Sequence, residues 1–293
     1  MKSKKLTVLL VTYNHGKYID KALDSILAQK TNFDFKIHIL NDKSTDNTTQ
    51  IANEYTIKHP EKIIHKLREE NLGVVGNIFD GIKNVETEYY ALLEGDDYWS
   101  DVNKLQEQVD ALDENPDCTL CGHNTIAKYN DGSEKLLFTD KKHNIKEKYS
   151  FPKKLVKKDF VKVHPSSRVF RTSAIDFDNL KDVSTVVWDS CAYWYFLEKG
   201  NMFFINKPMS VYNFTEEGIF SGSSKKKQKV MALKNIFAIN KEFNFKYNRL
   251  FLPLLLKYKK DFKLSFKERL EARFKPATLG EKYDEIITRL KLD

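Results

Sequence analysis

Three clusters of polar residues follow hydrophobic runs in the first hundred residues, and together they could bind a charged ligand. They are Thr12-Tyr13-Asn14, Asn41-Asp42-Lys43-Ser44-Thr45-Asp46 and Glu94-Gly95-Asp96-Asp97-Tyr98-Trp99. Adjacent carboxylates such as Asp96 and Asp97 repel each other unless a cation lies beside them. Hard divalent cations bind carboxylate oxygens together with substrate phosphates. The third cluster therefore predicts a Mn²⁺ or Mg²⁺ site, because capping the next helix would need only one aspartate.

Strand-like and helix-like segments alternate around these clusters. Near-continuous apolar runs predict buried strands over residues 6–11, 35–40, 62–67 and 89–93. Amphipathic spacing and caps predict helices over residues 19–27, 46–58, 74–83 and 103–113. This alternation is typical of a doubly wound, mainly parallel sheet with helices on both faces. The loops that follow parallel strands lie at one edge of such a sheet, so we expect the three clusters to meet there.

The pattern changes after Pro116. A hairpin is indicated by strand-like residues 119–129 and 134–138 around the turn 130–133. Helical spacing begins at Trp188 and ends at Gly200, and residues 202–205 and 209–214 predict two further strands. We therefore expect a domain over residues 1–222, with a nucleotide-binding half over 1–115 and an acceptor half over 116–222. Residues 223–293 would form a basic, helical C-terminal extension.

The motifs V-T-Y-N, N-D-K-S-T-D-N-T and E-G-D-D-Y-W, with Lys104-Leu105-Gln106 after the last, occur in order along residues 5–115. In order and spacing they resemble the family 2 glycosyltransferases of the GT-A fold. The resemblance implies an enzyme that uses a nucleotide sugar. Thr12, Tyr13 and Asn14 would contact the nucleotide, with the Tyr13 ring stacked on the base.

The resemblance also implies roles for residues after the later strands. Asp42 would accept a hydrogen bond from the base imide, which points to uridine, with thymidine as the alternative. Asn71 and Asn77 would flank the nucleotide. Asp96 would hold the ribose or the donor sugar, and Asp97 together with Asp96 would bind Mn²⁺ or Mg²⁺.

A single carboxylate can act as the base of an inverting transfer, because the metal stabilises the departing diphosphate. In this family the base opens a helix in the second half of the domain, and Asp189 matches that position. The acceptor side would be lined by residues of two segments and by Trp99. The matching residues are His164, Ser166, Ser167, Arg171 and Trp188. Some family members carry a metal-binding histidine where this chain has Thr215 or Glu216.

The resemblance leads us to expect transfer of a single sugar from a UDP-sugar to a glycan or lipid-linked acceptor in bacterial surface-glycan synthesis (capsule, lipopolysaccharide or glycoprotein oligosaccharide). Processive synthases of this fold carry a Q-x-x-R-W motif and membrane helices, which this sequence does not show. Two other functions remain open: a nucleotidyltransferase acting on sugar phosphates, or a non-catalytic basic binding module. A nucleotidyltransferase would need a glycine-rich loop after the first strand, where only Gly16 stands.

The net charge of +8 is concentrated at the C-terminal end. Residues 225–275 hold 16 Lys and Arg against 4 Asp and Glu, so this segment carries +12 and the remainder −4. The segment could contact an anionic membrane surface or a second subunit of a homo-oligomer; we do not expect it to bind nucleic acid. No signal peptide is recognisable, and Cys118 and Cys121 fit buried strand positions better than a metal or redox site. We expect a cytoplasmic protein that can lie on the inner face of the membrane.

Overall fold

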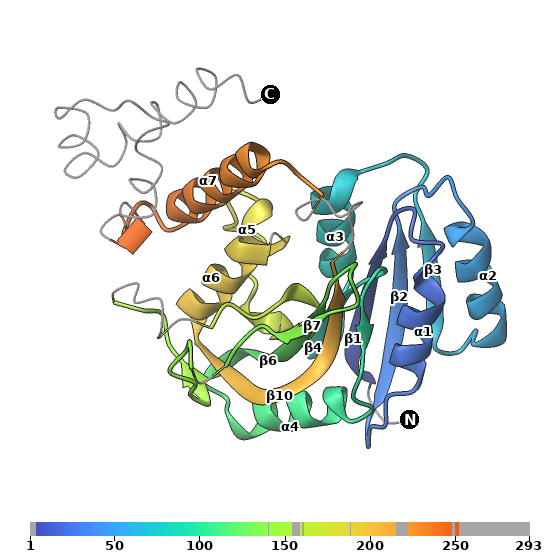
Figure 1. The fold of residues 1–293 in the computed structure, drawn as a ribbon, viewed down its shortest axis with the longest axis horizontal. Helices are drawn as coiled ribbons and strands as arrows, with labels where there is room; N and C mark the ends of the chain where they lie inside the picture. The colour runs from blue at the N-terminus through green and yellow to red at the C-terminus, as the bar shows by residue number, and fades with distance from the viewer. Residues whose placement is uncertain are drawn as a thin grey trace.

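The computed structural model describes residues 4–139, 141–153, 159, 161–187, 189–214, 222–247 and 250–251. A single large sheet runs through the molecule, with helices on both sides (Figure 1). The strand order along its main path is β3-β2-β1-β4-β9-β6-β10-β5, with β7 paired to β6 and β8 paired to β10. The predicted α/β fold with a mainly parallel sheet is thus confirmed.

The first half contains the predicted alternation of strands and helices. Its elements are β1 (Lys4–Thr12), α1 (Ile19–Leu27), β2 (Asp34–Asn41), α2 (Thr48–Lys58), β3 (Ile63–Leu67), α3 (Gly73–Lys83), β4 (Tyr89–Glu94), β5 (Tyr98–Trp99) and α4 (Lys104–Glu114). Strands β3, β2, β1 and β4 are all parallel. Asp46 supports the start of α2, where its Oδ1 accepts a hydrogen bond from the Thr48 N–H at 2.9 Å.

The second half contains β6 (Cys118–Lys128), β7 (Glu134–Leu136), β8 (Lys148–Tyr149), β9 (Val169–Arg171), α5 (Ser184–Val187), α6 (Asp189–Lys199), β10 (Asn201–Asn213) and α7 (Lys225–Glu242), with short 3₁₀ turns at Pro165–Ser167 and Thr172–Ala174. The β6–β7 hairpin confirms the predicted turn. The two strands predicted over 202–214 are one strand, β10, whose pairing with β6 is irregular between Ile205 and Ser210. The sequence pattern suggests that Pro208 interrupts the strand. Instead, a bulge in the pairing lets β10 continue past Pro208.

Alternate residues of β1 face two separate hydrophobic cores. Leu6, Val8 and Leu10 pack with α1 and α4 on one face of the sheet. Leu9 and Val11 pack on the other face with α3, α5 and α6. Burial on both faces explains the near-continuous apolar character of this strand.

Helix α7 belongs to the second core, because Ile239 near its end and Phe243 just after it are buried there. Figure 1 shows α7 lying over α5 and α6. The described part of the predicted basic extension is therefore helical and packed against the sheet domain. Residues 252–293 lie outside the described part. No helix of the described residues is long and apolar enough to cross a membrane.

The three cysteines are free and buried. Burial raises the pKa of Cys118 to about 11 and that of Cys121 to about 12. The expectation that Cys118 and Cys121 are buried strand residues is confirmed.

Candidate active site

The ends of β1, β2 and β4 meet at one edge of the sheet. Thr12 lies opposite Asn41, and Val11 lies opposite Glu94. The backbone pairing continues one residue past the strand ends, since Asp42 N–H donates to Thr12 O at 3.0 Å and Gly95 N–H donates to Val11 O at 2.8 Å. All three polar clusters are thereby brought together, as the sequence predicts.

The loops after β1 and β2 are joined by Asn14. Its backbone N–H donates to Ser44 Oγ at 3.0 Å, and its Oδ1 accepts from the Thr45 N–H at 2.8 Å. Asn14 has a φ of 56°, a left-handed conformation that asparagine tolerates better than most residues. Tyr13 precedes Asn14 in this loop, and 45% of its surface is exposed at the sheet edge. An exposed ring on a fixed backbone suits stacking on a flat ligand.

Asp42 and Asn71 also meet at this edge. Asn71 Nδ2 donates to the Asp42 carbonyl oxygen at 3.0 Å, and Asp42 Oδ1 accepts from the Leu72 N–H at 2.7 Å. These bonds fix the Asp42 carboxylate, while its Oδ2 has no hydrogen-bond partner among the described residues. Asp42 is therefore oriented and retains one free acceptor oxygen.

Asn77 is a correction to the expected nucleotide contacts. Its side chain is fully buried, donating to Leu40 O at 2.9 Å and accepting from Arg68 Nε at 2.9 Å. Both ends of the amide are occupied in the protein interior, so Asn77 supports the end of β2 from beneath. The sequence pattern places Asn77 within the predicted helix, but it does not show which face of α3 the side chain occupies.

Gly95 lies tightly against the loop that follows β1. A Cβ atom at this position would stand 2.7 Å from His15 Nδ1 and 2.9 Å from Thr12 Oγ1. Both of these polar atoms are buried and lack a hydrogen-bond partner in the described structure. Thr12 and His15 thus offer two unsatisfied polar atoms beside the acidic motif.

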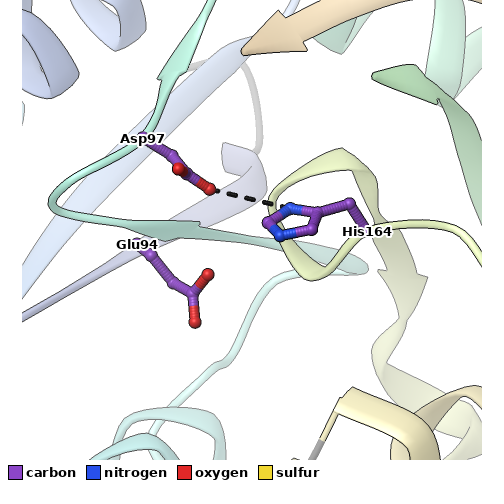
Figure 2. Close-up of side chains that lie close together, drawn as sticks. All are labelled: Glu94, Asp97 and His164. Atoms are coloured by element: carbon purple, nitrogen blue, oxygen red, sulfur yellow. Dashed lines mark ion pairs between the residues drawn. The ribbon is translucent and has the colours of Figure 1, made fainter. Parts of the chain in front are cut away.

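Glu94, Asp97 and His164 form an acidic and histidine cluster whose candidate ligand atoms all lie within 4.8 Å of one another (Figure 2). Asp97 Oδ2 stands 3.6 Å from His164 Nδ1. The Asp97 side chain is held on both sides, accepting from Ser166 Oγ at 2.6 Å and from the Asn213 N–H at 3.1 Å. Asn213 Nδ2 also donates to the backbone oxygen of Asp96 at 2.5 Å. The end of β10 therefore fixes the acidic motif.

The carboxylates of this cluster act on one another, and the Arg168 charge offsets this only in part at Glu94. Burial, together with the charges of Asp96 and Asp189, raises the pKa of Glu94 to about 8. Burial and the charges of Asp96 and Glu94 likewise raise the pKa of Asp97 well above its usual range. The carboxylates of Glu94 and Asp96 have neither a hydrogen bond nor an ion pair in the part of the chain that the structure describes. Crowded carboxylates without a counterion are the expected surroundings of a cation.

The donor set fits a divalent cation. Burial lowers the pKa of His164 to about 3, which leaves its imidazole neutral at physiological pH. A neutral imidazole with two carboxylates suits Mn²⁺, and carboxylates with phosphate oxygens suit Mg²⁺. The sequence predicts Asp97 and Asp96 as metal ligands; the cluster contains Asp97 but not Asp96, and Glu94 and His164 are additions. The sequence places His164 on the acceptor side, and only the fold brings it to the acidic motif.

The direction of β9 explains where the segment 164–171 lies. Because β9 pairs antiparallel with β4, the residues before it lie near the carboxyl end of β4 and Arg171 lies at the opposite end. His164 and Ser166 thus reach Asp97. Arg171 instead lies beside Tyr89, with its guanidinium bonded to the carbonyl oxygens of Cys118 and Leu112. The structure thus places Arg171 away from the acidic motif, at the other end of β9 from His164 and Ser166.

Two other predicted acceptor residues are buried. Trp99 is 4% exposed, and its Nε1 donates to Ser166 O at 2.9 Å. Ser167 is fully buried, and its hydroxyl donates to His164 O at 2.7 Å. Both residues shape the loop that carries His164 and offer no surface to an acceptor. Trp188 lies outside the described residues, as do Thr215 and Glu216.

Asp189 begins α6 and is held by two cations. Arg168 donates to its backbone oxygen at 2.8 Å and to its Oδ1 at 2.5 Å, and Lys162 Nζ lies 2.6 Å from its Oδ2. Desolvation acts to raise the pKa of Asp189, but the charges of Lys162 and Arg168 outweigh it and hold the pKa well below its usual range. The side chain is 38% exposed, so an ionised carboxylate is presented at the surface of the site.

Asp189 lies near enough to the acidic cluster for its charge to act on two of its members. Its charge raises the pKa of Glu94 and opposes the lowering of the His164 pKa. The site therefore joins an exposed aromatic ring and a fixed acceptor oxygen, the cluster of Glu94, Asp97 and His164, and a separate ionised carboxylate. Lys162, Arg168 and Asn213 complete it, although the sequence does not single them out. No strong local sequence pattern indicates these three residues, because their roles depend on partners that are distant in the sequence.

The exposed Tyr13 ring, the crowded carboxylates and the separate Asp189 carboxylate gather at the edge of the sheet where open α/β folds bind ligands. Residues 7–177 match the model of the family described as glycosyl transferase family 2. The chain therefore belongs to that glycosyltransferase family.

Relatives by sequence match part of the chain. An uncharacterised protein of Mycobacterium tuberculosis is 40% identical over 129 residues, which are 44% of this chain and 37% of that protein. An uncharacterised glycosyltransferase of Nostoc is 32% identical over 127 residues, which are 43% of this chain and 38% of that protein. The matched part thus spans less than half of each relative.

Solved structures share the fold. Residues 1–349 of S. aureus TarS with UDP-GlcNAc superpose with a TM-score of 0.62 at 16% identity, covering 98% of this chain and 83% of TarS 1–349. The mannosyltransferase PcManGT from Pyrobaculum calidifontis, with GDP-Man and Mn²⁺, gives a TM-score of 0.56 at 12% identity, covering 98% of this chain and 83% of PcManGT. At these identities the similarity concerns the GT-A fold.

Proposed function

We propose that this glycosyltransferase is inverting and metal-dependent and transfers a single sugar from a UDP-sugar to an acceptor hydroxyl. The observation that carries the proposal is the position of Asp189. It is an ionised carboxylate, partly exposed, and its charge acts on the cation-binding cluster at the same sheet edge. An inverting displacement needs one base on the face opposite the leaving group, which is the role that this carboxylate would fill.

Asp189 would accept the proton of the attacking hydroxyl as the new glycosidic bond forms and the bond to the diphosphate breaks. Arg168 would hold one carboxylate oxygen in place, so the proton would be taken at Oδ2. Lys162 occupies that oxygen in the free protein and would have to yield it to the acceptor. A low pKa makes Asp189 a weak base but keeps it ionised at every physiological pH.

Glu94, Asp97 and His164 would hold Mn²⁺ or Mg²⁺, with Asp96 beside them. A cation bound there would offset the charge that develops on the departing diphosphate. The Mn²⁺ in PcManGT supports this assignment. The rigid placement of Asp97 by Ser166 and Asn213 would keep the cluster ready for the ion.

Tyr13 and Asp42 would bind the base of the donor. The exposed Tyr13 ring supports stacking, and the free Oδ2 of Asp42 would accept the imide N–H of uracil. UDP and UDP-GlcNAc bound to TarS support a uridine nucleotide. GDP-Man bound to PcManGT shows that proteins of this fold also take guanosine, so the test must compare both.

A panel of UDP-, GDP- and dTDP-sugars, each with Mn²⁺, Mg²⁺ or EDTA, tests the proposal. Thermal stabilisation and donor hydrolysis should be largest for a UDP-sugar with Mn²⁺ and should disappear with EDTA. Asp97→Asn should fold and lose most of the metal-dependent activity. Equal activity with EDTA, or Asp97→Asn within a few fold of the wild-type rate at saturating Mn²⁺, would contradict metal dependence.

We further propose that the enzyme acts in bacterial surface-glycan synthesis on a glycan or lipid-linked acceptor, in the cytoplasm at the inner face of the membrane. The charge of +12 over residues 225–275 supports contact with anionic lipid. Packing of Ile239 and Phe243 into the domain core supports the alternative, in which this segment's apolar residues serve the fold or a homo-oligomer interface. Vesicle sedimentation separates the two, because binding that ignores lipid charge and salt would exclude the membrane contact.

A further inference from the structure

Lys104 is a fully buried cation with no hydrogen-bond acceptor in the described structure. It occupies the first residue of α4, and its Nζ is absent from the protein surface. The titratable groups that interact with it electrostatically are Cys121 and His123. His123 stays neutral, because burial lowers its pKa well below the usual value. Burying an ammonium without a counter-charge is strongly unfavourable, so this residue needs an explanation.

The Lys104 ammonium lies over the ring of Trp99. Nζ stands 4.0 Å from the ring centre, within the range of a cation–π interaction. Burial lowers the pKa of Lys104 to about 7, a value at which the ammonium form is still present near neutral pH. Trp99 is itself buried, so the pair forms in the protein interior, where such an interaction is strongest.

Trp99 connects Lys104 to the acidic cluster. Its Nε1 donates to Ser166 O at 2.9 Å, and Ser166 Oγ donates to Asp97 Oδ2 at 2.6 Å. Ser166 N–H also points to His164 Nδ1, at 3.4 Å. The Trp99 indole therefore holds the turn that contains Ser166 and His164 in place. The Lys104 ammonium in turn holds the indole in place.

We propose that Lys104 is a positioning residue for the metal site, acting through Trp99 and Ser166 on the Asp97 carboxylate and on His164. The inference rests on the proposed function, because it assumes that Asp97 and His164 bind a divalent cation. Outer contacts of this kind orient the ligands, and their loss typically weakens metal affinity about 10- to 100-fold. Lys104 touches neither substrate nor metal, so its effect would be indirect.

Mn²⁺ affinity measured by electron paramagnetic resonance, with UDP present, tests the inference. Lys104→Met retains a long unbranched side chain and removes the charge. We expect this variant to bind Mn²⁺ about tenfold more weakly than the wild type. UDP affinity without metal should be unchanged. Trp99→Phe keeps an aromatic ring but removes the donor to Ser166, so it should cause a similar loss. The double variant should lose no more than either single variant, since both break one chain of contacts.

Lys21→Met is the matched control. Lys21 Nζ lies 3.5 Å from the ring centre of Tyr98, next to Trp99 in the sequence, but Lys21 is exposed. This variant should bind Mn²⁺ as the wild type does. Wild-type Mn²⁺ affinity in folded Lys104→Met and Trp99→Phe would overturn the inference and leave the proposed function standing. If wild-type protein itself does not bind Mn²⁺, the proposed metal site fails and the inference with it. Should Lys104→Met not fold, Trp99→Phe alone decides the question.

Discussion

Arg168 binds Asp189 at two points, the backbone oxygen and carboxylate oxygen Oδ1. The same guanidinium also donates to Val163 O through Nε, at 3.1 Å. Arg168 is 1% exposed, so it joins the start of α6 to the segment before β9 from inside the protein. The proposed base is thereby fixed in both position and orientation by a residue that an acceptor cannot reach.

Arg168→Met should lower the turnover number for transfer about 100-fold, because an error of about 1 Å in the base position has an effect of that size. The KM for the donor should change little, since Arg168 does not face the nucleotide loops. Steady-state kinetics on protein shown to be folded by circular dichroism gives the answer. Arg171→Met is the control, because Arg171 is a largely buried arginine at the far end of β9. Equal losses in the two variants would indicate a general packing effect.

Asp189→Asn should reduce transfer about 10²- to 10⁴-fold, the usual effect of removing a general base. UDP affinity by calorimetry should remain near the wild-type value, because Asp189 lies apart from Tyr13 and Asp42 in the proposed site. A parallel fall in UDP affinity would instead mark Asp189 as a structural residue at the start of α6.

The metal-free protein should lose stability as pH rises from about 5 to 8. Glu94 has an ordinary pKa of 4.5, raised to about 8 in the folded state, so the folded protein holds this proton more tightly than the unfolded chain. The resulting stabilisation is present below the unfolded pKa and is lost as pH passes through the folded one. Melting temperatures in EDTA across this range measure it. Glu94→Gln should flatten the dependence, and a profile unchanged by Glu94→Gln would contradict the assignment.

Asp42→Ala should weaken UDP binding more than it weakens binding of the ribose diphosphate fragment alone. The reason is that Asp42 would read the base, whereas the phosphates would contact the metal site. Competition with UDP, GDP and ADP on the wild type and the variant measures the preference. If the wild type prefers GDP, Asp42 does not accept from a pyrimidine imide.

The elements of the first half follow from local sequence patterns, because β1 and β4 are buried on both faces and the loops after β1, β2 and β4 carry distinct motifs. The alternation of strands and helices is therefore enough to place Thr12, Asp42 and Asp97 at one edge of the sheet. The second half is less predictable because β9 runs against β4. That reversal brings His164 to Asp97 and takes Arg171 away, and no local pattern encodes it.

Local sequence patterns also do not predict which side chains the fold buries. The sequence predicts Trp99 at the surface of the site, yet its neighbour Lys104 and the Ser166 carbonyl keep it inside. The sequence also predicts Asn77 beside the nucleotide, yet it supports β2 from within. In both cases the residue type suggests a ligand contact, and packing against distant segments decides the outcome.

Because all three cysteines are buried, the rate at which a thiol reagent modifies them reports local opening of this protein. Cys118 and Cys121 lie in β6 at the middle of the sheet, and Cys191 lies in α6 just behind the proposed base. Because burial raises their pKa values, the native protein presents almost no thiolate to an alkylating reagent. Modification of each cysteine would therefore report when its own segment opens. Comparing Cys191 with the two in β6 would show whether the base-bearing helix opens separately from the sheet or together with it.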